Sequence, residues 1–65
     1  MTGEEAKNAL LKGSPVVHKN IVYKRIQAIR YTRDKGKIAI SLELLDRNKK
    51  SVSVVPIKEA EIYQE

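Results

Sequence analysis

The residues with the clearest potential for chemistry lie in one stretch of the chain, residues 21–37. This stretch holds six basic residues and one aspartate, a net charge of +5, which equals the net charge of the whole chain. Two tyrosines, Tyr23 and Tyr31, are interleaved with these cations. Cations neutralise phosphates, and aromatic rings stack on unpaired bases. The pattern therefore indicates a surface for single-stranded nucleic acid or RNA.

The nucleic-acid hypothesis assigns five cations to phosphates and a tyrosine to base stacking. Its residues are Tyr23, Arg25, Arg30, Tyr31, Arg33, Lys35 and Lys37. A second turn adds Arg47, Lys49 and Lys50. Solubility is the competing explanation, because small soluble domains often carry a net charge of about 2–8. Lysines in turns and on edge strands also keep sheets from joining, and tyrosines often pack at a rim. Both explanations stay open at this point.

Catalysis has little support in the sequence. His18 is the only histidine and there is no cysteine, so we predict no metal site and place His18 at an exposed or rim position. Ser14, His18 and Asp34 have the residue types of a triad, but the nucleophile-elbow motif is missing. Four acidic residues could pair as acid and base: Glu43, Asp46, Glu59 and Glu61. A domain this small has little volume for a substrate cleft of about 300 Å³, so we predict a non-enzymatic protein without a cofactor.

The elements that position these residues are mainly strands. Residues 37–45 alternate apolar and polar side chains, which predicts a strand with Ile38, Ile40, Leu42 and Leu44 on its buried side. Turn residues stand on both sides of it, in 34–36 and 46–50. The next strand, residues 51–55, is predicted to bury Val52 and Val54 and to end at Pro56, which cannot donate to the ladder.

Residues 21–33 are rich in β-branched and aromatic residues but too long for one straight strand in a small domain. Their alternation also changes phase, because Ala28 and Ile29 are adjacent and belong to opposite apolar sets. We predict a bend or bulge near Ala28 and Ile29, since one extra residue switches the face that side chains occupy.

The ends of the chain complete the predicted order. Thr2 and Glu5 have the capping-box spacing, which predicts a helix over residues 3–12 that ends at Gly13. We expect Leu10 or Leu11 to dock this helix on an open end of the sheet. Residues 16–18 are predicted to form a first strand, 57–60 a helical turn, and 61–63 a closing strand.

The length and composition of the chain predict its number of domains, the make-up of its core and its location. Sixty-five residues predict one domain over 1–65, with a core of Ile, Val, Leu and Ala because Trp and Phe are absent. No run approaches the roughly 20 apolar residues of a membrane span, and the acidic N-terminus lacks the features of a signal peptide. Together with the absence of cysteine, these features predict a soluble, cytoplasmic protein.

This order of elements resembles the SH3-like small barrel over residues 16–63. The resemblance implies a mainly β fold of about five antiparallel strands with a short N-terminal helix. The chain has no Trp, so it does not imply a proline-rich ligand. The segments Tyr23-Lys24-Arg25-Ile26 and Glu43-Leu44-Leu45-Asp46 are also similar to small uncharacterised proteins of bacterial prophages and mobile elements, which implies no site.

A protein-interaction or assembly module is the alternative function. The apolar face of the helix could bind a partner or a second copy, and an exposed strand edge could join two copies about a two-fold axis. The sequence thus predicts a non-enzymatic binding module, with nucleic-acid binding as the first hypothesis and protein–protein interaction or assembly as the alternative.

Overall fold

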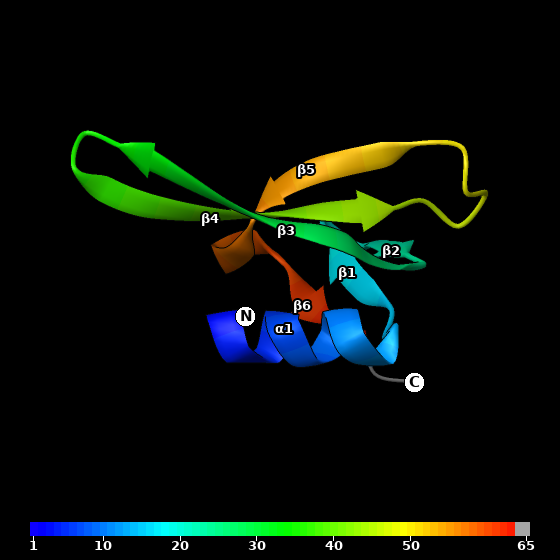
Figure 1. Cartoon of the computed structure of the whole chain (residues 1–65). Coiled ribbons are helices and arrows are strands. Elements are labelled where there is room, and N and C mark those ends of the chain that lie inside the picture. Colours follow the sequence, from blue (N-terminus) through cyan, green and yellow to red (C-terminus); the bar gives the residue numbers. More distant parts are fainter. Residues whose placement is uncertain (64–65) are drawn as a thin grey trace.

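Two antiparallel three-stranded sheets and one α-helix make up the computed structural model, which describes residues 1–63 (Figure 1). The elements are α1 (Gly3–Lys12), β1 (Val16–His18), β2 (Ile21–Tyr23), β3 (Arg25–Asp34), β4 (Lys37–Leu45), β5 (Val52–Pro56), the 3₁₀ helix η1 (Ile57–Glu59) and β6 (Glu61–Ile62). The first sheet has the order β2-β1-β6 and the second the order β3-β4-β5.

The predicted mainly β architecture with an N-terminal helix is confirmed. Over residues 1–63 the strands form two separate sheets, and neither sheet closes into a barrel. None of the helices in this part of the chain has the length and apolar character needed to cross a membrane.

Helix α1 begins and ends where its capping residues predict. The Glu5 backbone N–H donates to Thr2 Oγ1 at 3.1 Å, and the Thr2 backbone N–H donates to Glu5 Oε1 at 2.8 Å. The backbone N–H of Thr2, followed by its side chain, lowers the pKa of the Glu5 carboxyl. Gly13 follows the helix in the left-handed conformation, with φ of 70°, and its N–H donates to the carbonyl of Ala9.

Helix α1 packs against β3 through small side chains. Ala6 and Ala9 are fully buried, Leu10 is half-buried and Leu11 is exposed. The expected docking of Leu10 or Leu11 therefore holds only in part and only for Leu10. Alanine has no atoms beyond Cβ, so this face lets the helix backbone approach the sheet closely.

The long second strand predicted for residues 21–33 is divided in two. Lys24 separates β2 from β3, and its backbone N–H donates to the Leu45 carbonyl at 2.9 Å. The predicted irregularity within β3 exists, but it lies between Ile26 and Ala28, slightly earlier than expected. The extra residue is Gln27, and it lets both Ile26 and Ile29 face the core.

The core lies under the half of the second sheet nearest to β1 and β2. Ile26, Leu42 and Leu44 are fully buried there, together with Val16 of β1 and the two alanines of α1. The other half of the β3–β4 hairpin extends past α1, as the green strands on the left of Figure 1 show. Ile38 lies in this extended half and is 61% exposed, so its predicted burial is wrong.

The phase predicted for β5 is also wrong. Val55 pairs with Leu42 and Ser53 pairs with Leu44, so Val55 and Ser53 share the core side of the sheet. Val52 and Val54 lie on the outer side, where Val54 is 52% exposed. Because Val54 and Val55 are adjacent and both apolar, the local sequence allows either of them to face the core. The pairing of β5 with β4 places Val55 on the core side.

Candidate functional site

The cations proposed to bind nucleic acid do not form one cluster. Arg25 stands at the inner end of the β3–β4 hairpin, paired with Leu45, whereas Lys35 lies in the turn at the outer end. The ten residues of β3 span about 30 Å at roughly 3.3 Å per residue. The hairpin therefore separates its inner cations from Arg33, Lys35 and Lys37 at the outer end.

The two candidate tyrosines have different surroundings. Tyr23 is only 8% exposed and belongs to the core cluster, so neither face of its ring is free for a base. Tyr31 is 66% exposed. Of the two, only Tyr31 could stack on a ligand.

Residues of the hairpin alternate between its two faces. Tyr31 pairs with Ile40 and Arg33 with Ile38, on the face that continues outward from the core. Arg30 pairs with Ser41 on the opposite face, where its Nε lies 3.6 Å from Glu43 Oε2. This contact supplies Arg30 with a neighbouring negative charge, although an exposed ion pair contributes little stability.

A second group of cations comes together at the inner end of the hairpin. Lys24 lies close to Lys49 and to its sequence neighbour Arg25 there, and we call these three residues the basic cluster. The positive charge of Lys49, then partial desolvation, and then the charge of Arg25 lower the pKa of Lys24. The ion pairs within residues 1–63 are His18–Glu59 and Arg30–Glu43, so no acidic group is paired with any member of the basic cluster.

The loop between β4 and β5 positions Lys49. Asp46 accepts the backbone N–H of Arg47 at 2.7 Å and the Ser51 hydroxyl at 3.3 Å, and its carbonyl accepts the Lys49 N–H at 2.9 Å. The Asp46 carboxylate is thus used within the loop. Figure 1 shows this yellow loop at the end of the molecule opposite the β3–β4 turn. The sequence indicated that the loop is basic, but its closeness to Lys24 depends on strand pairing.

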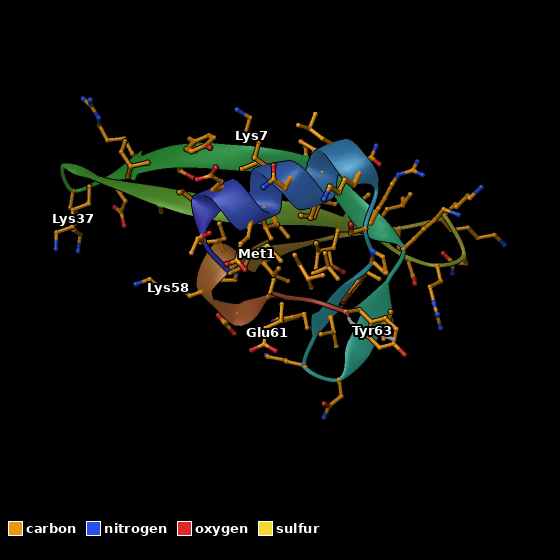
Figure 2. The ribbon with its side chains drawn as sticks, turned by 90° about the horizontal axis from the view of Figure 1, so that it is seen from below. Met1, Lys7, Lys37, Lys58, Glu61 and Tyr63 are labelled. Atoms are coloured by element: carbon orange, nitrogen blue, oxygen red, sulfur yellow. The ribbon has the colours of Figure 1, made fainter. Side chains whose placement is uncertain are left out.

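A groove lies beside the contact of α1 with β3, on the side of Tyr31, and we call it the helix–hairpin groove. Its volume is about 670 Å³, which exceeds the cleft of about 300 Å³ for which we expected little room. It is lined by Gly3, Glu4, Lys7, Asn8, Leu10, Ile29 and Tyr31. Figure 2 labels Lys7 on α1, beside the strands of the hairpin. The groove combines an exposed aromatic ring, aliphatic side chains and a side-chain amide.

Of the residues considered for catalysis, the structure brings His18 and Glu59 together. His18 is more buried than predicted, and its Nε2 lies 3.6 Å from Glu59 Oε1 without a hydrogen-bond partner. Within the described part of the chain, no three metal-ligating side chains are grouped as a metal ion would need.

No family model, curated protein or solved structure matches this chain. The resemblances to SH3-like barrels and to prophage proteins therefore gain no support from known proteins.

Proposed function

We propose that this protein binds single-stranded nucleic acid without catalysing a reaction. Phosphates would bind the basic cluster, and one base would stack on Tyr31 in the helix–hairpin groove. The observation that carries this proposal is the closeness of Lys24 to Lys49, beside Arg25, with no acidic partner among residues 1–63. Lys35 and Lys37 lie at the far end of the hairpin and are not part of the proposed site.

The electrostatics of the basic cluster favour a polyanion. Like charges held together raise the free energy of the unbound protein, and a phosphate between Lys24 and Lys49 would relieve that repulsion. Binding would also release counterions from the nucleic acid, which makes affinity depend on salt. These contacts carry no sequence information, so they would support general rather than sequence-specific binding.

The helix–hairpin groove supplies contacts for a base. The exposed ring of Tyr31 offers a stacking face, and the apolar side chains of Leu10 and Ile29 line the same groove. The Asn8 amide can both donate to and accept from a base edge. Glu4 and Lys7 at the same groove carry opposite charges, so the groove offers a base apolar and aromatic contacts without a net charge for a phosphate.

A further part of the proposal concerns the fold. We infer that the two sheets are an open form of an SH3-like barrel. In support, β2 and β3 follow each other with only Lys24 between them, and each belongs to a different sheet. The last strand, β6, also pairs with β1. NMR distance restraints between strands test this inference, because contacts that close the gap between the sheets would support it, and their absence would contradict it.

An NMR titration tests the proposed binding. The labelled protein would be titrated with a mixed-sequence single-stranded oligonucleotide at low salt and then near physiological salt. We expect shifts at residues 24–25, 47–50 and around Tyr31. Three phosphate contacts predict a slope of log affinity against log salt of about −2, at roughly 0.7 per contact for single strands. Shifts absent from the basic cluster at low salt would overturn the proposal.

Two double variants of equal net charge distinguish phosphate binding by the basic cluster from general attraction by the net charge of the protein. The double variant Lys24→Gln/Lys49→Gln removes two phosphate contacts, so the salt slope should fall in magnitude by about 1.4. The matched control Lys37→Gln/Lys58→Gln has the same net charge and should keep the slope. Equal losses in both variants would mean that net charge alone attracts the oligonucleotide.

Tyr31 variants test the base contact separately. Tyr31→Ala should weaken binding by about 5- to 150-fold, because base–aromatic stacking contributes about 1–3 kcal/mol per base. Tyr31→Phe retains the ring and should bind like the unchanged protein. Unchanged affinity in Tyr31→Ala would remove the helix–hairpin groove from the proposed site.

A further inference from the structure

One edge of β4 is open at the outer end of the hairpin. The pairing of β5 with β4 runs from Val52 opposite Leu45 to Pro56 opposite Ser41. Proline has no N–H to donate, and the chain turns into η1 directly after Pro56. Strand β4 continues outward, so within residues 1–63 its segment 37–40 has β3 on one side and no strand on the other.

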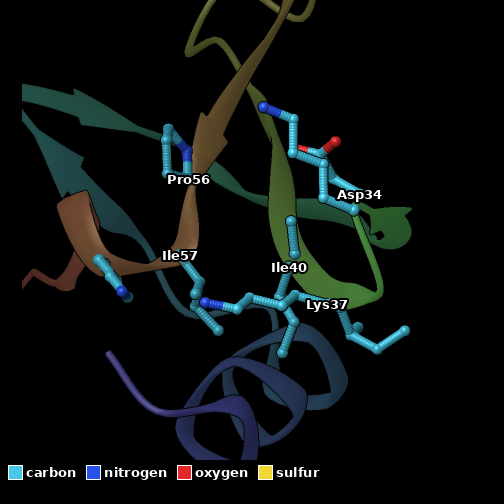
Figure 3. Close-up of a pocket in the computed structure, with 9 residues that line it drawn as sticks. Asp34, Lys37, Ile40, Pro56 and Ile57 are labelled. Carbon is cyan, nitrogen blue, oxygen red and sulfur yellow. The ribbon is translucent and has the colours of Figure 1, made fainter.

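A groove lies where β5 leaves this edge. It has a volume of about 560 Å³, and we call it the β4-edge groove. Figure 3 shows Ile40 of β4 and Ile57 of η1 on its two sides. Its apolar residues are Ile38, Ala39, Ile40, Pro56 and Ile57, and its charged residues are Asp34, Lys35, Lys37 and Lys58.

We infer that the β4-edge groove binds an extended acidic segment of a partner protein, which adds to the sheet as a strand beside residues 37–40. An open strand edge presents backbone N–H and C=O groups that pair with an incoming strand. Every second side chain of that strand would meet the apolar residues of the groove. Three lysines against one aspartate would attract negatively charged side chains. This inference does not use the basic cluster, which lies at the other end of the hairpin, although Tyr31 of the proposed nucleic-acid site pairs with Ile40 of this groove.

Charge disfavours a second copy at this edge, and the aliphatic lining disfavours a nucleic acid. A second copy pairing through the same edge would bring the lysines of its own groove to the same interface, and like charges gathered at one interface repel each other. A nucleic acid would meet Asp34 and an aliphatic surface without an aromatic ring for stacking. An acidic peptide with alternating aliphatic residues matches both the charge and the apolar surface of the groove.

A blocked peptide of alternating glutamate and valine is a suitable probe. In an NMR titration we expect shifts at residues 37–41 and 56–58. Hydrogen exchange should slow at every second backbone amide between 37 and 40, because only alternate amides of a strand point toward the new neighbour. A peptide of alternating lysine and valine should not bind. Shifts without slowed exchange, or shifts caused by raising the protein concentration alone, would overturn the inference.

Charge reversal gives a rescue experiment. The double variant Lys37→Glu/Lys58→Glu should bind the glutamate–valine peptide with an affinity lower by tenfold or more. It should also bind the lysine–valine peptide, which the unchanged protein does not bind. Gain of the second peptide shows that the variant is folded. The control Lys24→Glu/Lys49→Glu has the same net charge and should keep the original preference. An unchanged preference in the first variant, or its reversal in the control, would contradict the inference without bearing on the nucleic-acid proposal.

Discussion

The inner and outer halves of the β3–β4 hairpin share one pattern and differ in burial. Along one face of β4, Ile38 is 61% exposed and Ile40 is half-buried, whereas Leu42 and Leu44 are fully buried. Helix α1 and the first sheet cover only the inner half. An alternating pattern therefore defines which face of a strand is apolar, and burial depends on what covers that face.

The two ends of the hairpin also differ in how their cations are arranged. At the inner end, the basic cluster holds like charges close together, and no acidic group of the described residues pairs with it. At the outer end, Lys35, Lys37 and Lys58 surround an apolar groove beside an open strand edge. The first arrangement suits a string of phosphates, and the second suits an acidic peptide with aliphatic side chains.

The largest expected effect concerns burial on the inner half. Leu44→Ala should lower the free energy of unfolding by about 2–5 kcal/mol, because it removes fully buried atoms and leaves a cavity. Ile38→Ala, on the same face of the same strand, should change it by less than about 1 kcal/mol. Chemical denaturation of both variants measures the difference. Similar losses of unfolding free energy in the two variants would contradict the difference in burial between the two halves.

The close approach of α1 to the sheet gives the next largest effect. Ala9→Leu inserts three carbons into a fully buried position, and overpacking of this kind costs about 1–3 kcal/mol. Leu11→Ala, two residues later on the exposed side of the helix, should change stability little. Thermal unfolding compares the two variants. A neutral Ala9→Leu would mean that the helix covers the inner half less closely than the structure describes.

A smaller effect is expected at the helix N-terminus. Thr2→Ala removes the hydroxyl that accepts the Glu5 N–H, which should cost about 1 kcal/mol. Thr2→Ser keeps that acceptor and is the matched control. Helix fraying would weaken the cover over the inner half, so amide exchange in α1 should become faster. Equal exchange rates in Thr2→Ala and Thr2→Ser would show that the cap has no role in holding α1.

The smallest effect is a change in titration at the basic cluster. In Lys49→Gln the pKa of Lys24 should rise toward its ordinary value, because Lys49 is the main cause of its lowering. Because the pKa of Lys24 is lowered in the folded protein, the unfolded protein binds more protons between the folded pKa and the ordinary value. The free energy of unfolding should therefore rise as the pH rises from the folded pKa toward the ordinary value. NMR titration of the Lys24 side chain measures the shift. Arg30→Gln, outside the cluster, is the control and should leave that pKa unchanged. An unaltered Lys24 pKa in Lys49→Gln would mean that the two lysines are not neighbours in solution.

Several parts of the fold could be predicted because their signals are local. Thr2, Glu5 and Gly13 define the ends of α1 through interactions within a few residues of each other. The phase change between Ala28 and Ile29 predicted an irregular strand, although the extra residue is Gln27. The burial of Tyr23 and the outward position of Val54 could not be predicted in this way, since each depends on a partner strand or layer far away in the sequence.

The candidate sites also combine features that depend on the local sequence with features that depend on distant segments. Composition was enough to identify the cations and tyrosines of the hairpin, and local pattern was enough to place them on strands and turns. Only the pairing of β3 with β4, and of β4 with β5, brings Lys24 next to Lys49 and leaves residues 37–40 with an open edge. Secondary structure follows from interactions between near neighbours in the chain. A cluster of charges or an open edge is created when distant segments meet, so tertiary structure decided both.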